Sequence, residues 1–200
     1  ISSFTSSPST TLYEFASSAT YDLDFNWSTN TTPTTITLAS DFSSPVLNSS
    51  DTTYDEPAFS ITNSTGAEVS HSWILSVTDS QNSSDSSTKT IRWVYPFFYG
   101  EDTSDLSGGT GIETSLTKSV SRKGDKTLGI SAANEFIYFA YPATYGDLST
   151  ILDGNGFNVF SSFTKHTANV TPPVSGVARS YNIYKSNSVT TINQNFQFKF

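Results

Sequence analysis

The residues Tyr21-Asp22-Leu23-Asp24-Phe25-Asn26-Trp27 alternate strictly between apolar and polar side chains. Successive side chains of a β-strand point to opposite faces, so this stretch predicts a strand with one buried and one solvated face. The last seven residues, Gln194-Asn195-Phe196-Gln197-Phe198-Lys199-Phe200, show the same pattern. Three phenylalanines on one face would not sit in water, so this second strand is expected to close a sheet or to dock on a partner.

The rest of the first half is also typical of short strands. A strand is predicted at Thr34–Leu38, and the stretches His71–Thr78 and Lys89–Tyr95 are expected to form a hairpin with a polar tip at 79–87. Residues 41–55 are predicted to be mainly loop. Short strands separated by turns, with Trp73 in an inner strand, are typical of an immunoglobulin-like sandwich.

The second half resumes the β pattern after an aromatic stretch and an acidic, glycine-rich segment at 101–111. The stretch Glu135–Tyr141 is apolar on both faces, which predicts a central strand covered on both sides. The terminal strand is expected to pair beside the strand at Tyr181–Tyr184. The best helix candidate is 112–120. The sequence thus predicts an all-β protein of two tandem β-sandwich domains, 1–100 and 101–200, the first immunoglobulin-like.

The composition limits the classes of function. Charged residues make up 14% of the 200, against roughly 25% in an average soluble protein. The formal net charge is −8, the opposite of the balance in nucleic-acid-binding proteins, so no nucleic-acid partner is expected. The absence of cysteine excludes disulfides and thiolate metal sites. No apolar run reaches the length of a membrane span. Because the chain starts at Ile1 without a methionine, it is expected to be processed or part of a longer polypeptide.

An ordered set of short motifs resembles structural proteins of tailed bacteriophages. It comprises Phe136-Ile137-Tyr138-Phe139-Ala140-Tyr141-Pro142 with Gly146, the turn Asp153-Gly154-Asn155-Gly156-Phe157, and Tyr181-Asn182-Ile183-Tyr184 before the terminal strand. Upstream, Phe25-Asn26-Trp27, then Leu75-Ser76-Val77-Thr78-Asp79, then Phe98-Tyr99-Gly100 resemble the immunoglobulin-like unit of those proteins. The resemblance spans nearly the whole chain. It implies a virion protein of the tail, baseplate or fibre that contacts other virion proteins and copies of itself.

Catalytic and metal-binding chemistry has few candidates, and we expect no enzyme, no cofactor and no metal site. His71 and His166 lack a Gly-x-Ser-x-Gly elbow and are predicted to be ordinary surface or edge residues. The carboxylate pairs of a glycosidase could come from residues 22 and 24, 55 and 56, or 101 and 102. The first pair is predicted to lie on a solvated strand face, and the other two in charged loops. Asp153-x-Asn155 lacks the late glutamate of a calcium loop and is predicted to be a turn.

Aromatic residues are the candidates for interfaces, since they are enriched at the energetic centres of protein contacts. They either bind a partner or a sugar, or fill the junction between the two sandwiches. Three other roles stay open: a receptor-binding adhesin for host surface polysaccharide, a capsid decoration protein, and a depolymerase, which needs two convergent carboxylates. The candidate interface residues are Trp93, Tyr95, Phe97, Phe98, Tyr99, Phe196, Phe198 and Phe200.

Overall fold

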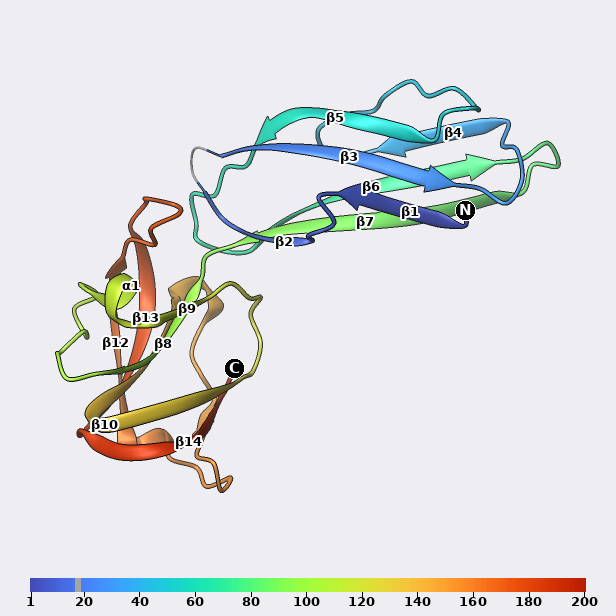
Figure 1. Ribbon diagram of the computed structural model, residues 1–200. Coiled ribbons are helices and arrows are strands. Elements are labelled where there is room, and N and C mark those ends of the chain that lie inside the picture. Colours follow the sequence, from blue (N-terminus) through green and yellow to red (C-terminus); the bar gives the residue numbers. More distant parts are fainter. Residues whose placement is uncertain (17–18) are drawn as a thin grey trace. The chain divides into compact units, whose positions relative to one another are not determined.

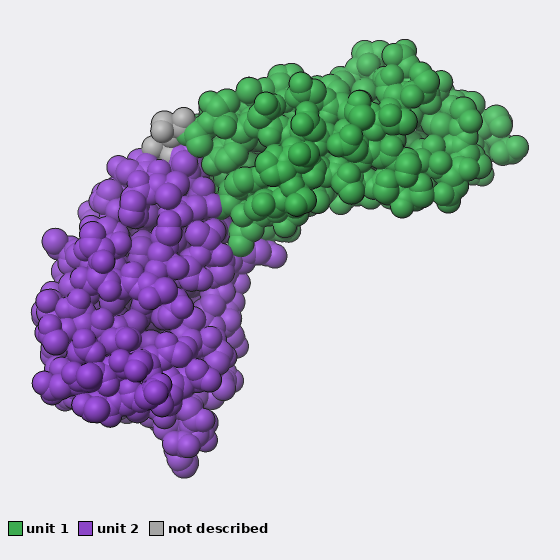
Figure 2. Space-filling view, in the orientation of Figure 1, with its two compact units in different colours: residues 1–13, 18–62, 69–93 green, residues 14–17, 63–68, 94–200 purple. Residues whose placement is uncertain are grey.

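The structure is a computed structural model that describes residues 1–16 and 19–200. It is all-β and of the β-sandwich class, which confirms the predicted fold class. Contacts divide the chain into two compact units, coloured separately in Figure 2. Unit 1 consists of Ile1–Tyr13, Ser18–Thr62 and Val69–Trp93, and unit 2 of Glu14–Ser17, Asn63–Glu68 and Val94–Phe200. The tandem pair of sandwiches, the immunoglobulin-like assignment of the first and the division at residue 100 stay predictions.

Two sheets carry the strands of the first half (Figure 1). The first sheet has the order β1-β3-β5, with β1 at Ser3–Ser7, β3 at Thr20–Ser28 and β5 at Thr53–Ser60. The second has the order β2-β7-β6-β4, with strands at Leu12–Glu14, Ser84–Val94, Val69–Thr78 and Thr35–Ala39. The pairs β1–β3, β3–β5, β4–β6 and β6–β7 are antiparallel.

The core of unit 1 is formed by the inward faces of these strands. Trp73 on β6 is fully buried, and its ring centroid lies 5.3 Å from that of Phe25 on β3. Tyr21 on β3 meets Trp93 on β7 edge to face at 5.2 Å. Aromatic pairs at these distances add to the burial of apolar area. The alternation in the sequence therefore sends these side chains to the faces on which they meet.

Several predicted loops of the first half are strand. β5 begins at Thr53, and β7 begins at Ser84, so the predicted loop and hairpin tip are both shorter than expected. β1 and β2 were not predicted, because Ser and Thr dominate the first residues and leave little apolar alternation. Pairing with β3 and β7 orders these segments, which local sequence does not encode.

Unit 2 holds one branched sheet of seven strands. Its main order is β11-β14-β10-β13-β12, and β8 pairs with both β10 and β9. The strands are β8 (Phe97–Asp102), β9 (Thr117–Ser119), β10 (Lys126–Pro142), β11 (Thr150–Leu152), β12 (Phe163–Val170), β13 (Arg179–Ser186) and β14 (Thr190–Lys199). The short helices are α1 (Ile112–Ser115), η1 (Ala143–Tyr145) and η2 (Phe160–Ser162).

A β-bulge divides β10 into two halves with opposite inward faces. The register with β14 shifts between Ala133 and Glu135, and Asn134 has φ 63°. Before the bulge Ile130 and Ala132 enter the core, and after it Ile137 and Phe139 do. One extra residue moves the inward set from even to odd numbers. The second half of β10 is buried on both faces, as predicted for a central strand.

Two predictions for the second half are wrong, and one strand was not predicted. The helix predicted at 112–120 ends at Ser115, because Thr117–Ser119 pairs with β8 as strand β9. The polar stretch Phe163–Val170 forms strand β12, for which no strand was predicted. The terminal strand β14 pairs with β10 and β11, so it does not lie beside β13, which pairs with β10 and β12. In the part of the chain that the structure describes, no helix is both long and apolar enough to cross a membrane.

Candidate functional site

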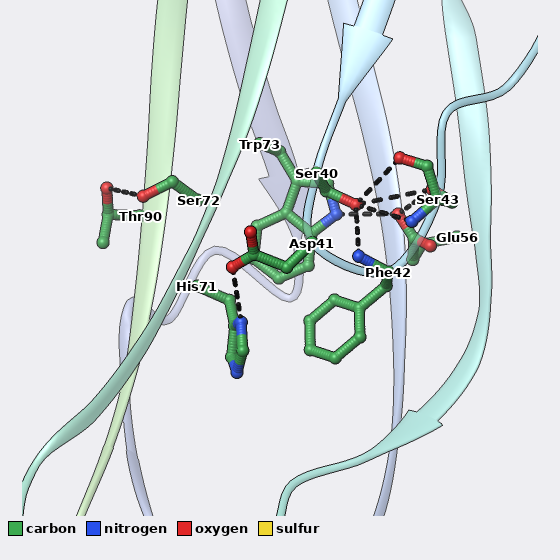
Figure 3. A network of polar contacts seen from close by, with 9 residues as sticks. All are labelled: Ser40, Asp41, Phe42, Ser43, Glu56, His71, Ser72, Trp73 and Thr90. Carbon is green, nitrogen blue, oxygen red and sulfur yellow. Dashed lines mark hydrogen bonds and ion pairs between the residues drawn. The ribbon is translucent and has the colours of Figure 1, made fainter.

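A buried carboxylate organises the polar network of unit 1 shown in Figure 3. Glu56 on β5 is only 1% exposed, although it was predicted to lie in a charged loop with Asp55. Its Oε2 accepts a hydrogen bond from Trp73 Nε1 at 2.7 Å and another from Ser43 Oγ at 2.9 Å. These two donors replace hydrogen bonds to water that the carboxylate loses when it is buried.

The neighbouring turn is held by its own hydroxyl and by aromatic contacts. Ser40 Oγ accepts hydrogen bonds from the backbone N–H groups of Phe42 and Ser43 at 3.1 and 3.0 Å. Phe42 packs on Phe59 with ring centroids 4.3 Å apart and on His71 at 4.4 Å. Ser43 links this turn to Glu56, so the network fastens residues 40–43 to the two sheets.

His71 forms a pair with Asp41, at 2.9 Å between Nδ1 and Oδ2. A hydrolytic triad would also need a nucleophile bonded to the ring. Ser40 bonds within its turn, and Ser72 bonds to Thr90 at 2.8 Å. Among the hydrogen bonds of the described residues, none joins a hydroxyl to His71. The second histidine, His166, lies on β12 opposite Ile183.

The carboxylate pairs occupy separate strands. Asp22 and Asp24 are exposed on the outer face of β3, as predicted, and Asp24 lies directly opposite Asp55 on β5. Glu101 and Asp102 end strand β8 rather than lying in a loop. Asp102 Oδ1 accepts a hydrogen bond from Ser104 N at 2.6 Å, and this bond lowers the pKa of Asp102.

The Asp153 stretch is a turn, as predicted. Asp153 Oδ1 accepts hydrogen bonds from the backbone N–H groups of Asn155 and Phe157, both at 2.9 Å. Both hydrogen bonds lie within the loop, so its own backbone occupies this carboxylate oxygen. Among residues 1–16 and 19–200, no group of three or more His, Asp or Glu side chains is arranged to hold a metal ion.

The predicted interface aromatics around residues 93–99 lie mostly in the interior of their own units. Trp93 is fully buried, and it stacks on Tyr13 at 5.9 Å. Tyr95, Phe97 and Phe98 are also buried, and Tyr99 packs partly buried against the core of unit 2. Their ring faces are therefore occupied within the chain, and their contact with a partner stays a prediction.

The terminal phenylalanines pack onto β10. Phe198 is fully buried and stacks on Phe139 with centroids 4.3 Å apart. Phe196 is buried, and Phe200 meets Tyr141 edge to face at 4.8 Å. Their partners lie within unit 2, so this strand completes its core.

An ion pair in unit 2 fixes the loop after β8. Lys185 Nζ lies 3.0 Å from Asp105 Oδ1 and 4.0 Å from the centre of the Phe136 ring. Ser107 N donates to the same Asp105 oxygen at 3.0 Å. The bonds from Ser107, together with that from Lys185, hold the pKa of Asp105 well below its usual range.

The outer face of strands β4, β6 and β7 is rich in Ser and Thr, and we name it the hydroxyl face. Its residues follow from the register, because the alternate positions of these strands point inward. Ser72 and Thr90 bond across the strands at 2.8 Å, and Thr78 and Ser84 at 3.0 Å. The face comprises Thr35, Thr37, Ala39, Ser70, Ser72, Ile74, Ser76, Thr78, Ser84, Ser86, Thr88, Thr90 and Arg92.

The two outer faces of unit 1 differ in charge. Only Arg92 is charged on the hydroxyl face, all of whose residues the structure describes, and Ile74 in its middle is 43% exposed. The outer face of the β1-β3-β5 sheet presents Asp22, Asp24 and Asp55 instead. The alternation of the sequence indicates both faces. The hydroxyl face was not predicted as an interface because only aromatic residues were considered as candidates.

Comparisons of this chain with protein-family models, with curated proteins and with solved structures gave no match.

Proposed function

We propose that this chain is a non-enzymatic structural component of a bacteriophage particle, in the tail, baseplate or fibre, that acts by protein–protein assembly. The hydroxyl face carries the proposal. A surface designed to face only water is given about 25–35% charged residues. A sheet face with one charged residue at its end departs from that pattern.

Physical chemistry favours this face as a contact surface. Burying a charged side chain requires the loss of its hydration, whereas a hydroxyl needs only one hydrogen-bond partner. Ser and Thr side chains also have few rotamers to lose on association compared with Lys or Glu. The exposed Ile74 supplies an apolar centre. The motif resemblance to phage structural proteins supports the particle as the setting.

The charge distribution favours the hydroxyl face over the acidic face for contact with another copy or another virion protein. Two copies that met through the acidic faces would bring Asp22, Asp24 and Asp55 of each toward one another. Such like-charge contacts oppose association. Contacts through the hydroxyl face carry no such repulsion, and repeated copies would give closed symmetric oligomers.

The first test locates the chain. Particles of a phage that encodes it would be purified and imaged by electron microscopy with a gold-labelled antibody against the chain. Label on the tail, baseplate or fibre is expected. Label on the capsid lattice would instead support a decoration protein, and absence of the chain from purified particles would refute the proposal.

The second test addresses the face. Thr88→Lys adds a positive charge to the centre of the hydroxyl face, opposite Ile74. The matched control Asn26→Lys adds the same charge to the exposed outer face of β3. Incorporation into particles, measured by quantitative mass spectrometry, is expected to fall for Thr88→Lys and to persist for Asn26→Lys. Equal incorporation of both variants would remove the hydroxyl face from the proposal.

A further inference from the structure

A hollow of about 400 Å³ lies in unit 1 where the connection between β3 and β4 faces the segment that enters β5. Residues 29–33 form one side and residues 49–52 the other. Trp27, Pro33 and Ile36 contribute its apolar part. The backbone N–H of Trp27 donates to the carbonyl of Thr52 at 2.9 Å, which fixes the second side against β3. Ligand sites commonly have volumes of this size.

Trp27, one of the residues that line this hollow, carries a buried hydrogen-bond donor without a partner in the described chain. The side chain is 4% exposed, and its Nε1 finds no hydrogen-bond partner among the residues that the structure describes. Trp73 shows the contrasting case in the same unit, because its Nε1 donates to Glu56. A buried donor without a partner lowers stability by roughly 1–3 kcal/mol. An acceptor atom that enters the hollow can regain that free energy.

The residues that line the hollow determine which class of ligand fits. Apart from its apolar part, the hollow is lined by hydroxyl and amide side chains and by Asp51. None of its described lining residues is Lys or Arg, so nothing there balances a phosphate, sulfate or carboxylate. Asp51 uses Oδ2 to accept from the backbone N–H of Asn48 at 2.7 Å. A carboxylate and several hydroxyls suit a ligand that is rich in hydroxyl groups and carries no negative charge.

We propose that this hollow binds a neutral saccharide, with Trp27 Nε1 donating a hydrogen bond to a sugar oxygen. The hydroxyls of the sugar would exchange hydrogen bonds with residues 29–32 and with Asp51, while the buried Pro33 and Ile36 bound the hollow on its apolar side. Residues 29–31 and Pro33 also line a second hollow of about 180 Å³. Two hollows on one loop favour an oligosaccharide over a single sugar. Because Nε1 is covered in this structure, binding requires a small shift of the wall.

The test uses the ¹⁵N-labelled full chain and the indole N–H signals of its three tryptophans. An array of neutral and acidic glycans would first select binders, and the selected neutral oligosaccharide would then be titrated, with its component monosaccharide in parallel. The Trp27 signal is expected to shift on titration, while the Trp73 signal stays in place. The oligosaccharide is expected to bind more tightly than the monosaccharide.

Two variants assign the effect. Trp27→Phe keeps an aromatic ring and removes a donor that has no partner, so the fold is expected to persist while affinity falls about five- to tenfold. Trp93→Phe is the matched control, because its Nε1 is also buried without a partner in the described chain and it does not line the hollow. That variant is expected to bind as tightly as the unchanged chain.

Three results would overturn the inference: no neutral glycan bound at any concentration tested, selection of acidic glycans alone, or equal affinity of Trp27→Phe and the unchanged chain. The inference does not depend on the proposed assembly role. A chain found in particles that binds no glycan loses only this inference, and a glycan-binding chain absent from particles loses only the assembly proposal.

Discussion

Replacing Glu56 by alanine should destabilise unit 1 through the loss of one acceptor. Oε2 of Glu56 serves both Trp73 Nε1 and Ser43 Oγ. Trp73 is fully buried, so its N–H would be left without a partner at a cost of about 1–3 kcal/mol. Ser43 is only partly buried and can turn to water. We therefore expect the free energy of unfolding to fall by about 2–3 kcal/mol, a large part of the 5–15 kcal/mol typical of a domain.

Tryptophan fluorescence reports on this unit selectively. Trp27, Trp73 and Trp93 all belong to unit 1. Urea unfolding followed by their fluorescence thus measures the stability of unit 1. With a slope near 2 kcal/mol per molar urea, the midpoint of Glu56→Ala is expected about 1–1.5 M below that of the unchanged chain, with an unaltered slope.

Two further variants test whether the Trp73 bond causes the loss. Glu56→Gln keeps an oxygen acceptor of the same shape, so it should lose less stability than Glu56→Ala. Trp73→Phe removes the donor, and in a double-mutant cycle it should couple to Glu56→Ala by about 1–2 kcal/mol. A midpoint for Glu56→Ala within error of the unchanged chain would refute the reasoning. A coupling energy of zero would do the same.

Three further predictions concern unit 2, which holds no tryptophan and is followed by the near-ultraviolet circular dichroism of its tyrosines. Tyr145→Phe should leave the stability of unit 2 unchanged or raise it by up to about 1 kcal/mol, because this buried hydroxyl has no partner among the described residues. The hydroxyl of Tyr181 donates to a backbone carbonyl at 2.9 Å, so Tyr181→Phe should lower the stability by about 1 kcal/mol. Equal effects of the two variants would contradict this reasoning. Deletion of Asn134 should abolish folding of unit 2, because it removes the extra residue of the β-bulge. Asn134→Gly should preserve folding, since glycine readily adopts φ 63°. A folded deletion variant would disprove the role of the bulge. The lowered pKa of Asp105 stabilises the fold above the unfolded value of 3.8, so unit 2 should lose stability as the pH falls below about 4. Asp105→Asn should flatten this dependence in urea unfolding series, and an unchanged pH profile would count against the bonds that Ser107 and Lys185 make to Asp105.

Strands with strict alternation were predictable from the sequence. Residues 21–27 and 71–78 became β3 and β6 because every second side chain is apolar and only one register buries them all. The polar segments that became β1 and β12 carry no such pattern. Their strands form because neighbouring strands offer backbone hydrogen bonds, which is a property of the pairing and not of local sequence.

The candidate sites were less predictable than the strands. The hydroxyl face needs the pairing of β4, β6 and β7, since its residues come from three separate stretches. Glu56 was expected in a loop because a carboxylate rarely lies in a core, and only the approach of Trp73 and Ser43 makes its burial tolerable. The hollow beside Trp27 likewise joins two loops that lie about 20 residues apart in the chain.

By itself the sequence determined the all-β class and the inward face of each alternating strand, because a period of two is a local property of the backbone. It also excluded disulfides, because the chain contains no cysteine. Tertiary structure alone decided the position of the terminal strand between β10 and β11, the change of inward face at Asn134, and the hydrogen-bond partners of Glu56. Each of these depends on which distant segments meet. Packing and hydrogen bonding across the whole unit decide which segments meet, and no single stretch of sequence specifies them.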